Sequence, residues 1–190
     1  ERCAAAASSR LHALLRKARR LGLDAERDVE GPGADMGFWQ DVEAWEELHA
    51  YIDHWAQPVL LAHLGEAANF DRSGCVMSLP GAPQQPWHQD GGVNNATGLL
   101  NAFMPLVPLC YENGPTQFLP FAVPPRTMQQ EDVPPVAPLP GRGEVLLFDY
   151  RVFHRGLANE STQPRPVAYV VYARPGASDR HNFPTERLEK

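Results

Sequence analysis

Residues 143–173 have the sequence GEVLLFDYRVFHRGLANESTQPRPVAYVVYA, and this stretch decides the fold class. It contains two runs rich in aliphatic and aromatic residues, Glu144 to Tyr150 and Val167 to Ala173, separated by a polar segment that contains Gly and Pro. Runs of this length and composition predict β-strands. Further strands are predicted outward from this stretch at Cys75 to Leu79, Leu99 to Val107 and Thr116 to Leu119. Glycine-containing turns separate them, so the pattern predicts a β-sandwich or barrel.

Two helices are predicted before the strands. From Ser8 to Leu23, leucines recur at three and four residues among arginines, which predicts an amphipathic helix with a basic outer face. A solvated face explains this better than docking on an anionic membrane, and we assign it no function. The second helix is predicted over Phe38 to Trp55. Its apolar residues at helical spacing are expected to pack in the core rather than to line a ligand groove: Trp45, Leu48, Ile52 and Trp55.

The size and composition of the chain indicate one folded domain. Its 190 residues fit a single core, predicted to comprise a helical support region at 1–65 and a strand-rich core at 70–175. The net charge of −6 disfavours nucleic acid as a partner. No run is apolar enough to span a bilayer, and the start at Glu1 rather than methionine indicates processing or trimming. The oligomeric state is not predicted.

The cysteines point to a reducing environment. Cys3, Cys75 and Cys110 are odd in number and widely spaced, which favours neither a disulfide framework nor a thiolate zinc site. An intracellular location is therefore expected. Residues 120–141 are rich in proline and poor in strand formers, which predicts a long surface loop. Such a loop fits a functional lid or a disordered insertion equally well.

A metal site is predicted from one short motif and one distant histidine. In Trp87-His88-Gln89-Asp90 an imidazole and a carboxylate stand two residues apart, so on an extended segment both project to the same face. His154 follows a predicted strand that can lie beside this segment. Two histidines and one carboxylate leave three positions of an octahedral iron(II) ion open for a cosubstrate and dioxygen. A single His-x-Asp is weak evidence, because the chain has seven histidines.

Arg165 is predicted to enter an apolar interior. It follows His154 by eleven positions (165 − 154) and shares a strand face with Val167, Tyr169 and Val171. A buried guanidinium needs an anion, and a carboxylate is its natural bidentate partner, so a dicarboxylate such as 2-oxoglutarate fits. Pairing with a protein carboxylate, or an outward orientation, is an equally valid alternative at this point.

These segments together resemble the phytanoyl-CoA dioxygenase family of iron(II)- and 2-oxoglutarate-dependent oxygenases. The resemblance rests on PWHQD, NAFMPLVPLCYENGPTQFLP and GEVLLFDYRVFHRGLANESTQPRP, and it covers roughly residues 70–175. It implies a double-stranded β-helix, or jelly roll, in the 70–175 core, with N-terminal helices. It also implies iron held by His88, Asp90 and His154, and 2-oxoglutarate held by Arg165 with Asn101 and Phe103 beside it.

The resemblance implies a hydroxylation of a small organic substrate by dioxygen, with release of succinate and CO2. Asp90 favours this over halogenation, because similar halogenases lack that carboxylate. Glu112-Asn113-Gly114 is similar to the family's hairpin turn, where glycine permits a positive φ. The sequence departs from the family where Phe121-Ala122-Val123 replaces the usual Gly-Ser-His, which concerns the substrate pocket rather than the iron site.

Other interpretations remain open. A catalytically silent metal-binding jelly roll is disfavoured by the presence of both the ligands and Arg165. A zinc hydrolase with the same ligands would have no evident use for Arg165. His181 has no partner at ligand spacing, so we expect it at the surface or facing substrate. The sequence does not identify the substrate, and a fatty acyl-CoA is not assumed.

Overall fold

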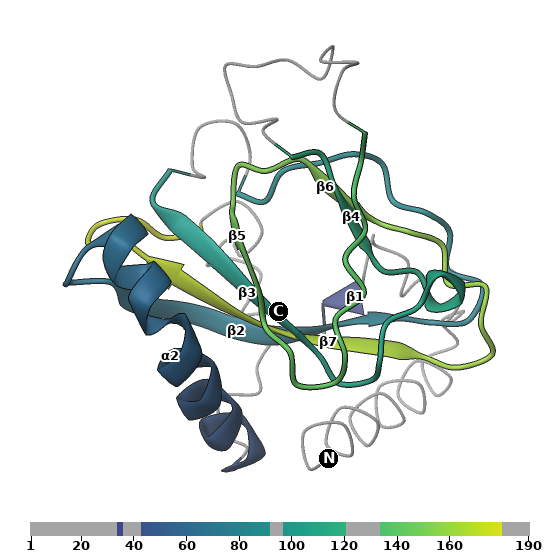
Figure 1. Cartoon of the computed structure of the whole chain (residues 1–190), viewed down its shortest axis with the longest axis horizontal. Helices are drawn as coiled ribbons and strands as arrows, with labels where there is room; N and C mark the ends of the chain where they lie inside the picture. The colour runs from purple at the N-terminus through teal and green to yellow at the C-terminus, as the bar shows by residue number, and fades with distance from the viewer. Residues whose placement is uncertain (1–33, 36–42, 92–96, 121–133, 180–190) are drawn as a thin grey trace, which may run out of the picture.

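The computed structural model describes residues 34–35, 43–91, 97–120 and 134–179 of the chain. In these ranges the chain forms one long helix and two antiparallel β-sheets, and the helix precedes every strand except the short β1 (Figure 1). The predicted helix at Ser8 to Leu23 lies outside these ranges, as do residues 121–133 of the proline-rich segment and His181. No helix in the described part of the chain is long and apolar enough to cross a membrane. The assignment of the whole chain to one domain stays a prediction.

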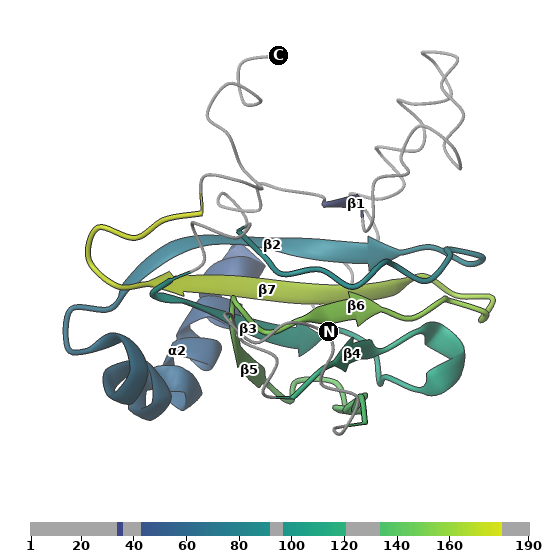
Figure 2. The same ribbon diagram turned by 90° about the horizontal axis from the view of Figure 1, so that it is seen from above.

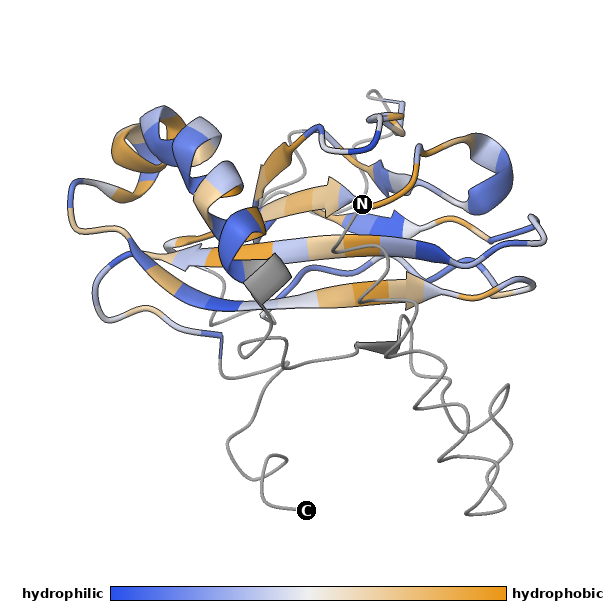
Figure 3. Ribbon diagram, turned by 90° about the horizontal axis from the view of Figure 1, so that it is seen from below, coloured by the Kyte–Doolittle hydropathy of each residue, from blue (hydrophilic) through white to orange (hydrophobic). Residues whose placement is uncertain are grey.

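The larger sheet has five strands in the order β1-β2-β7-β3-β5. These strands are β1 (Ala34–Asp35), β2 (Asn69–Ser78), β3 (Leu99–Pro105), β5 (Leu146–Asp149) and β7 (Arg165–Ala173). The central strand β7 is buried along its whole length, which explains its nearly continuous run of apolar residues. Figure 3 shows apolar colouring along much of the large sheet.

The smaller sheet pairs β4 (Thr116–Phe118) with β6 (His154–Gly156). Figures 1 and 2 show β4 and β6 lying across from the larger sheet. Strand β6 was not predicted, because three residues ending in glycine carry too little pattern to show a strand. Before β4, the predicted turn forms a short 3-10 helix, Tyr111–Asn113, and Gly114 follows with a φ of 73°, as expected.

Helix α2 (Glu43–Leu64) covers one face of the large sheet and runs past the predicted end at Trp55. Pro58 is tolerated within it because apolar residues continue to recur on the buried face. Those residues are spaced four apart and all are buried: Leu48, Ile52, Ala56, Leu60 and Leu64.

The prediction that Trp55 packs in the core is wrong. Trp55 is 61% exposed, whereas Ile52 is fully buried. Leu48 and Ile52 confirm the predicted core face, and Trp55 lies off that face by one residue from Ala56. Nothing is described for the side chain of Trp45.

The two faces of the large sheet contribute to different apolar clusters. Ala168, Val170 and Tyr172 of β7 pack towards α2, while Tyr169 and Val171 face the other way, towards the small sheet. On β3, Leu99 and Phe103 belong to this second, inner cluster. Alternation along a strand therefore gives the chain one face for the core under the helix and one face for the space between the sheets.

Candidate metal centre

Backbone pairing brings the two predicted histidine ligands together. The His88 amide donates to the His154 carbonyl at 3.0 Å, and the His154 amide donates to the His88 carbonyl at 2.9 Å. The two residues thus form an antiparallel bridge, although they are 66 positions apart (154 − 88). On its other side His154 pairs with Phe118 of β4. The predicted strand before His154 does not lie beside the His88 segment: it forms β5, which pairs with β3, and His154 itself bridges to His88.

Asp90 completes a compact cluster with the two histidines. One ligand atom from each of His88, Asp90 and His154 lies within 4.8 Å of the others. Asp90 Oδ2 is 3.6 Å from His154 Nε2. Two imidazoles and one carboxylate at this separation form the donor set that suits a facial iron(II) site with open positions.

The Nδ1 atoms of both histidines are held by backbone carbonyls. His88 Nδ1 lies 3.0 Å from the Pro86 carbonyl oxygen, and His154 Nδ1 lies 2.9 Å from that of Val152. A carbonyl only accepts, so Nδ1 must carry the proton in each ring. The lone pair of the neutral imidazole is then on Nε2, the nitrogen that faces the cluster in His154, and this arrangement orients histidine ligands in metal sites generally.

His154 is buried among aromatic rings, which favours its neutral form. The residue is 3% exposed, and its ring lies 5.1 Å from that of Phe148 and 5.8 Å from that of Phe118 between centroids. Burial lowers the pKa of His154, the nearby His88 lowers it further, and Asp90 opposes the shift. A neutral, desolvated imidazole is the form that a metal binds.

Strand β3 supplies the two residues expected beside the cosubstrate. Asn101 Nδ2 donates to Asp90 Oδ2 at 3.0 Å, and Asn101 is buried. The ring of Phe103 packs edge-on against Phe148 at 4.9 Å. Both residues lie on the inner face of the large sheet, on the same side as the cluster of His88, Asp90 and His154.

Arg165 is buried, and no carboxylate among the described residues pairs with it. It opens β7 opposite Ser78, its exposure is 5%, and its Nε has no hydrogen-bond partner. Within the described ranges no carboxylate forms an ion pair with it. Burial lowers the pKa of Arg165 to about 10, with a smaller opposite effect from Cys75, so the guanidinium is charged at neutral pH. A buried, charged and incompletely bonded guanidinium fits a ligand carboxylate.

Two residues near Arg165, Gly156 and Gln85, were not predicted from the sequence to belong to the site. A Cβ added to Gly156 would lie 3.0 Å from Gln85 Oε1 and 3.7 Å from Arg165 Nη2, so a side chain at residue 156 would press on Gln85 beside the guanidinium. Gln85 Oε1 accepts a hydrogen bond of 2.7 Å from the Gly156 amide, which fixes its position. The available signal was a glycine two residues after His154, on the same strand face.

The buried Tyr150, which follows β5, makes a hydrogen bond to Asp179 near the C-terminal end of the described residues. Tyr150 is 2% exposed, and its hydroxyl donates to Asp179 Oδ2 at 3.1 Å. Burial raises the pKa of Tyr150 well above its ordinary value, and the carboxylates of Asp90 and Asp179 raise it further. The carboxylate of Asp90 therefore contributes to the raised pKa of Tyr150.

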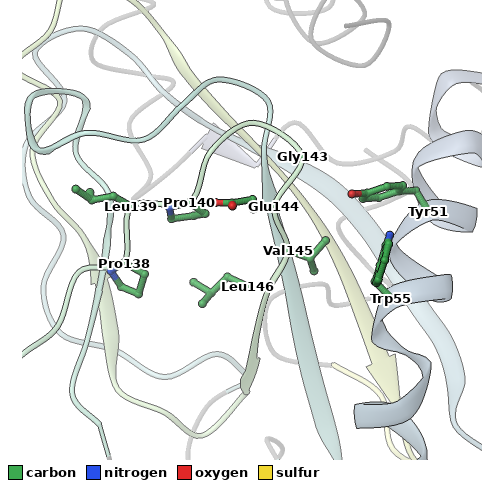
Figure 4. Close-up of a pocket in the computed structure, with 9 residues that line it drawn as sticks. All are labelled: Tyr51, Trp55, Pro138, Leu139, Pro140, Gly143, Glu144, Val145 and Leu146. Carbon is green, nitrogen blue, oxygen red and sulfur yellow. The ribbon is translucent and has the colours of Figure 1, made fainter.

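A separate pocket lies on the outside of the sheets. Its volume is about 650 Å³ and it runs between α2 and the start of β5 (Figure 4). Tyr51 and Trp55 line it from the helix, and Pro138 to Pro140 line it from the described end of the proline-rich segment. None of the three predicted metal ligands lines it. Whether residues 120–141 form a lid stays open, since 121–133 lie outside the described residues.

Comparison with known proteins identifies the family and the fold. A model of the phytanoyl-CoA dioxygenase (PhyH) family matches residues 3–167. Similar solved structures include EvdMO1, at 23% identity and a TM-score of 0.62, covering 75% of this chain and 36% of that one. AviO1 from Streptomyces viridochromogenes Tue57 has 19% identity and a TM-score of 0.62, covering 90% and 83%.

A third similar structure is SnoK, described as a non-heme alpha ketoglutarate dependent carbocyclase from nogalamycin biosynthesis. It has 20% identity and a TM-score of 0.60, covering 76% of this chain and 68% of SnoK. At such identities these likenesses show the fold alone. They confirm the predicted mainly β, jelly-roll class with a helix preceding the sheets.

Proposed function

The chain belongs to the phytanoyl-CoA dioxygenase family, whose members are non-haem iron(II)- and 2-oxoglutarate-dependent oxygenases, and we propose that it hydroxylates a small organic substrate. In this proposal His88, Asp90 and His154 hold iron(II), and Arg165 binds the distal carboxylate of 2-oxoglutarate. Phe103 borders the cosubstrate from β3. The chain spans only 36% of the length of EvdMO1. The activity assigned here to the whole protein is therefore a proposal.

One observation carries the proposal: a charged guanidinium, with no carboxylate partner among the described residues, is buried on the face of the large sheet that Asn101 shares, and Asn101 contacts Asp90 of the cluster. Arg165 opens β7 of the large sheet and His154 belongs to β6 of the small sheet, and a Cβ at Gly156 of β6 would lie 3.7 Å from Arg165 Nη2. A metal-binding module without a cosubstrate would gain nothing from this arginine and would lose stability through its burial. A dicarboxylate that chelates the metal at one end and meets Arg165 at the other accounts for both features.

The residues of the chain would contribute orientation and exclusion of water. Iron(II) with 2-oxoglutarate and dioxygen supplies an oxidation in which 2-oxoglutarate becomes succinate and CO2 and the second oxygen atom is inserted into a substrate C–H bond. The backbone carbonyls of Pro86 and Val152 keep both Nε2 lone pairs available. Phe118 and Phe148, packed against His154, keep its side of the site dry.

The proposal is tested by forming the iron–cosubstrate complex without oxygen. Iron(II) and 2-oxoglutarate are added to the purified protein, and the visible charge-transfer band of the chelate is recorded for wild type, His154→Ala and Arg165→Met. We expect the band in wild type, none in His154→Ala, and a band in Arg165→Met only at much higher 2-oxoglutarate. Succinate release in air then provides the assay for candidate substrates.

The variants also define the contrary result. A folded, iron-loaded wild type that gives no band with 2-oxoglutarate would favour the silent metal-binding module. A His154→Ala variant that keeps full succinate release would refute the ligand assignment. Membership of the family does not identify the substrate. The substrate screen should therefore cover small organic molecules and not be limited to acyl-CoA esters.

A further inference from the structure

Asn101 has an amide whose orientation is fixed by chemistry. Its Nδ2 lies 3.0 Å from Asp90 Oδ2. An ionised carboxylate only accepts hydrogen bonds, so the amide must turn its NH2 group, and not its oxygen, towards Asp90. The amide oxygen Oδ1 points elsewhere: it is buried and has no hydrogen-bond partner among the described residues.

The contact reaches the same carboxylate oxygen of Asp90 that lies near His154. Asp90 Oδ2, which accepts from Asn101, is also the oxygen 3.6 Å from His154 Nε2. A carboxylate without such a bond rotates and presents either oxygen to a metal. The donor on β3 therefore selects one oxygen and one orientation, and it does so from the sheet opposite the two histidines.

We propose that Asn101 is a positioning residue for the iron ligand Asp90 and does not itself bind 2-oxoglutarate. This rests on the proposed function, and it differs from the cosubstrate contact that the family resemblance implies. One N–H of Nδ2 is donated to Asp90, and Oδ1 can only accept. The second N–H of Nδ2 is the one donor left for a cosubstrate, so separate measurements of metal affinity and 2-oxoglutarate affinity distinguish the two roles. The 2-oxoglutarate dianion offers only acceptors, so Oδ1 suits a ligand with an O–H or N–H group instead.

A purely structural role predicts different behaviour. A buried carbonyl oxygen without a partner weakens the fold, so leucine at this position would pack at least as well. Selection for stability alone therefore does not explain the asparagine. A positioning role does explain it, because an asparagine that orders Asp90 for metal binding is useful even if the metal-free protein is less stable.

The test compares Asn101→Leu with Met104→Leu. Met104 is a buried residue on the same strand that packs towards α2, so its variant controls for a change in the packing of β3. Cobalt(II), and iron(II) without oxygen, are titrated into metal-free protein in the absence of 2-oxoglutarate. We expect Asn101→Leu to bind either metal about 10- to 100-fold more weakly, with an altered cobalt(II) absorption spectrum, while Met104→Leu matches wild type.

Two further readouts separate the explanations. Denaturation of the metal-free proteins should show that Asn101→Leu is at least as stable as wild type, whereas a structural asparagine would make it less stable. At saturating iron(II), the dissociation constant for 2-oxoglutarate from the charge-transfer band should be unchanged. A weakened 2-oxoglutarate complex with unchanged metal affinity would instead make Asn101 a cosubstrate ligand and overturn the proposal.

The outcomes for the metal alone are also decisive. Equal metal affinity of wild type and Asn101→Leu overturns the positioning role while leaving the proposed oxygenase function intact. Failure of wild type to bind iron(II) or cobalt(II) at all overturns the proposed function, and the inference with it.

Discussion

Replacing Arg165 by methionine should strengthen the fold and weaken cosubstrate binding at the same time. Burial lowers the pKa of Arg165 from its ordinary value to about 10. At about 1.4 kcal/mol for each tenfold change, this corresponds to roughly 3 kcal/mol of unfavourable burial of the charged form. The side chain is 5% exposed, so solvent screening relieves little of this cost. The cost is present throughout the neutral range, and it is relieved only as the pH rises through 10.

Methionine has a similar length and no charge to bury. We therefore expect the metal-free Arg165→Met variant to gain about 1–3 kcal/mol in the free energy of unfolding, measured by urea denaturation. Loss of a charge-assisted contact to a carboxylate, worth about 3 kcal/mol, should raise the dissociation constant for 2-oxoglutarate on the order of 100-fold. Titration of the charge-transfer band at saturating iron(II) measures this second effect.

Arg155→Met is the matched control. The Arg155 guanidinium lies 4.3 Å above the Trp87 ring, and its Nε donates to Gln117 Oε1 at 2.9 Å, so this arginine has partners. Its replacement should cost about 1 kcal/mol of stability and leave 2-oxoglutarate binding unchanged. A metal-free Arg165→Met protein that is less stable than wild type would show that the guanidinium is already compensated within the protein, and the argument for a ligand carboxylate would fail.

Three other variants test separate parts of the structure. Gly156→Ala should raise the 2-oxoglutarate dissociation constant without changing iron(II) affinity, because its Cβ would lie 3.0 Å from a side-chain oxygen beside the guanidinium; equal cosubstrate affinity would show that the space is not used. Tyr150→Phe removes a donor to the buried Asp179 carboxylate and should cost about 1–3 kcal/mol in urea denaturation, whereas an unchanged midpoint would mean that this bond is not formed in solution. Ile52→Ala should cost about 2–5 kcal/mol and Trp55→Ala less than about 1 kcal/mol, and the reverse order would contradict the described face of α2.

The sequence predicted those elements whose own residues carry a clear pattern. The apolar run of β7 and the turn before Gly114 were found because each is determined by residues close together in the chain. Strand β6 was missed because its pairing partners, and not its three residues, make it a strand. Trp55 was assigned to the wrong face because its spacing of three from Ile52 also fits a helical stripe, while the true face continues at Ala56, four residues after Ile52.

The same distinction applies to the candidate site. His88, Asp90 and Arg165 could be proposed from ligand type, spacing and the cost of burying a charge. The contact of Asn101 with Asp90, and the close approach of Gly156 to Gln85 and Arg165, join residues that are far apart in the chain. No local sequence pattern predicts them. Residue chemistry indicated what the site could bind, and only the folded chain shows how its ligands are held.

The division of the site between the two sheets explains why its motifs are so far apart in the chain. His154 belongs to β6 of the small sheet and His88 is bridged to it, so the separation of the two histidines is fixed by backbone hydrogen bonds. Asn101 and Arg165 come from the large sheet, where one contacts the ligand Asp90 and the other is buried with no carboxylate partner among the described residues. A metal held by the first group and a dicarboxylate held by the second would join the two sheets across the inner space. Binding would then stabilise the folded chain against unfolding, because a ligand stabilises the state that presents all of its contacts together.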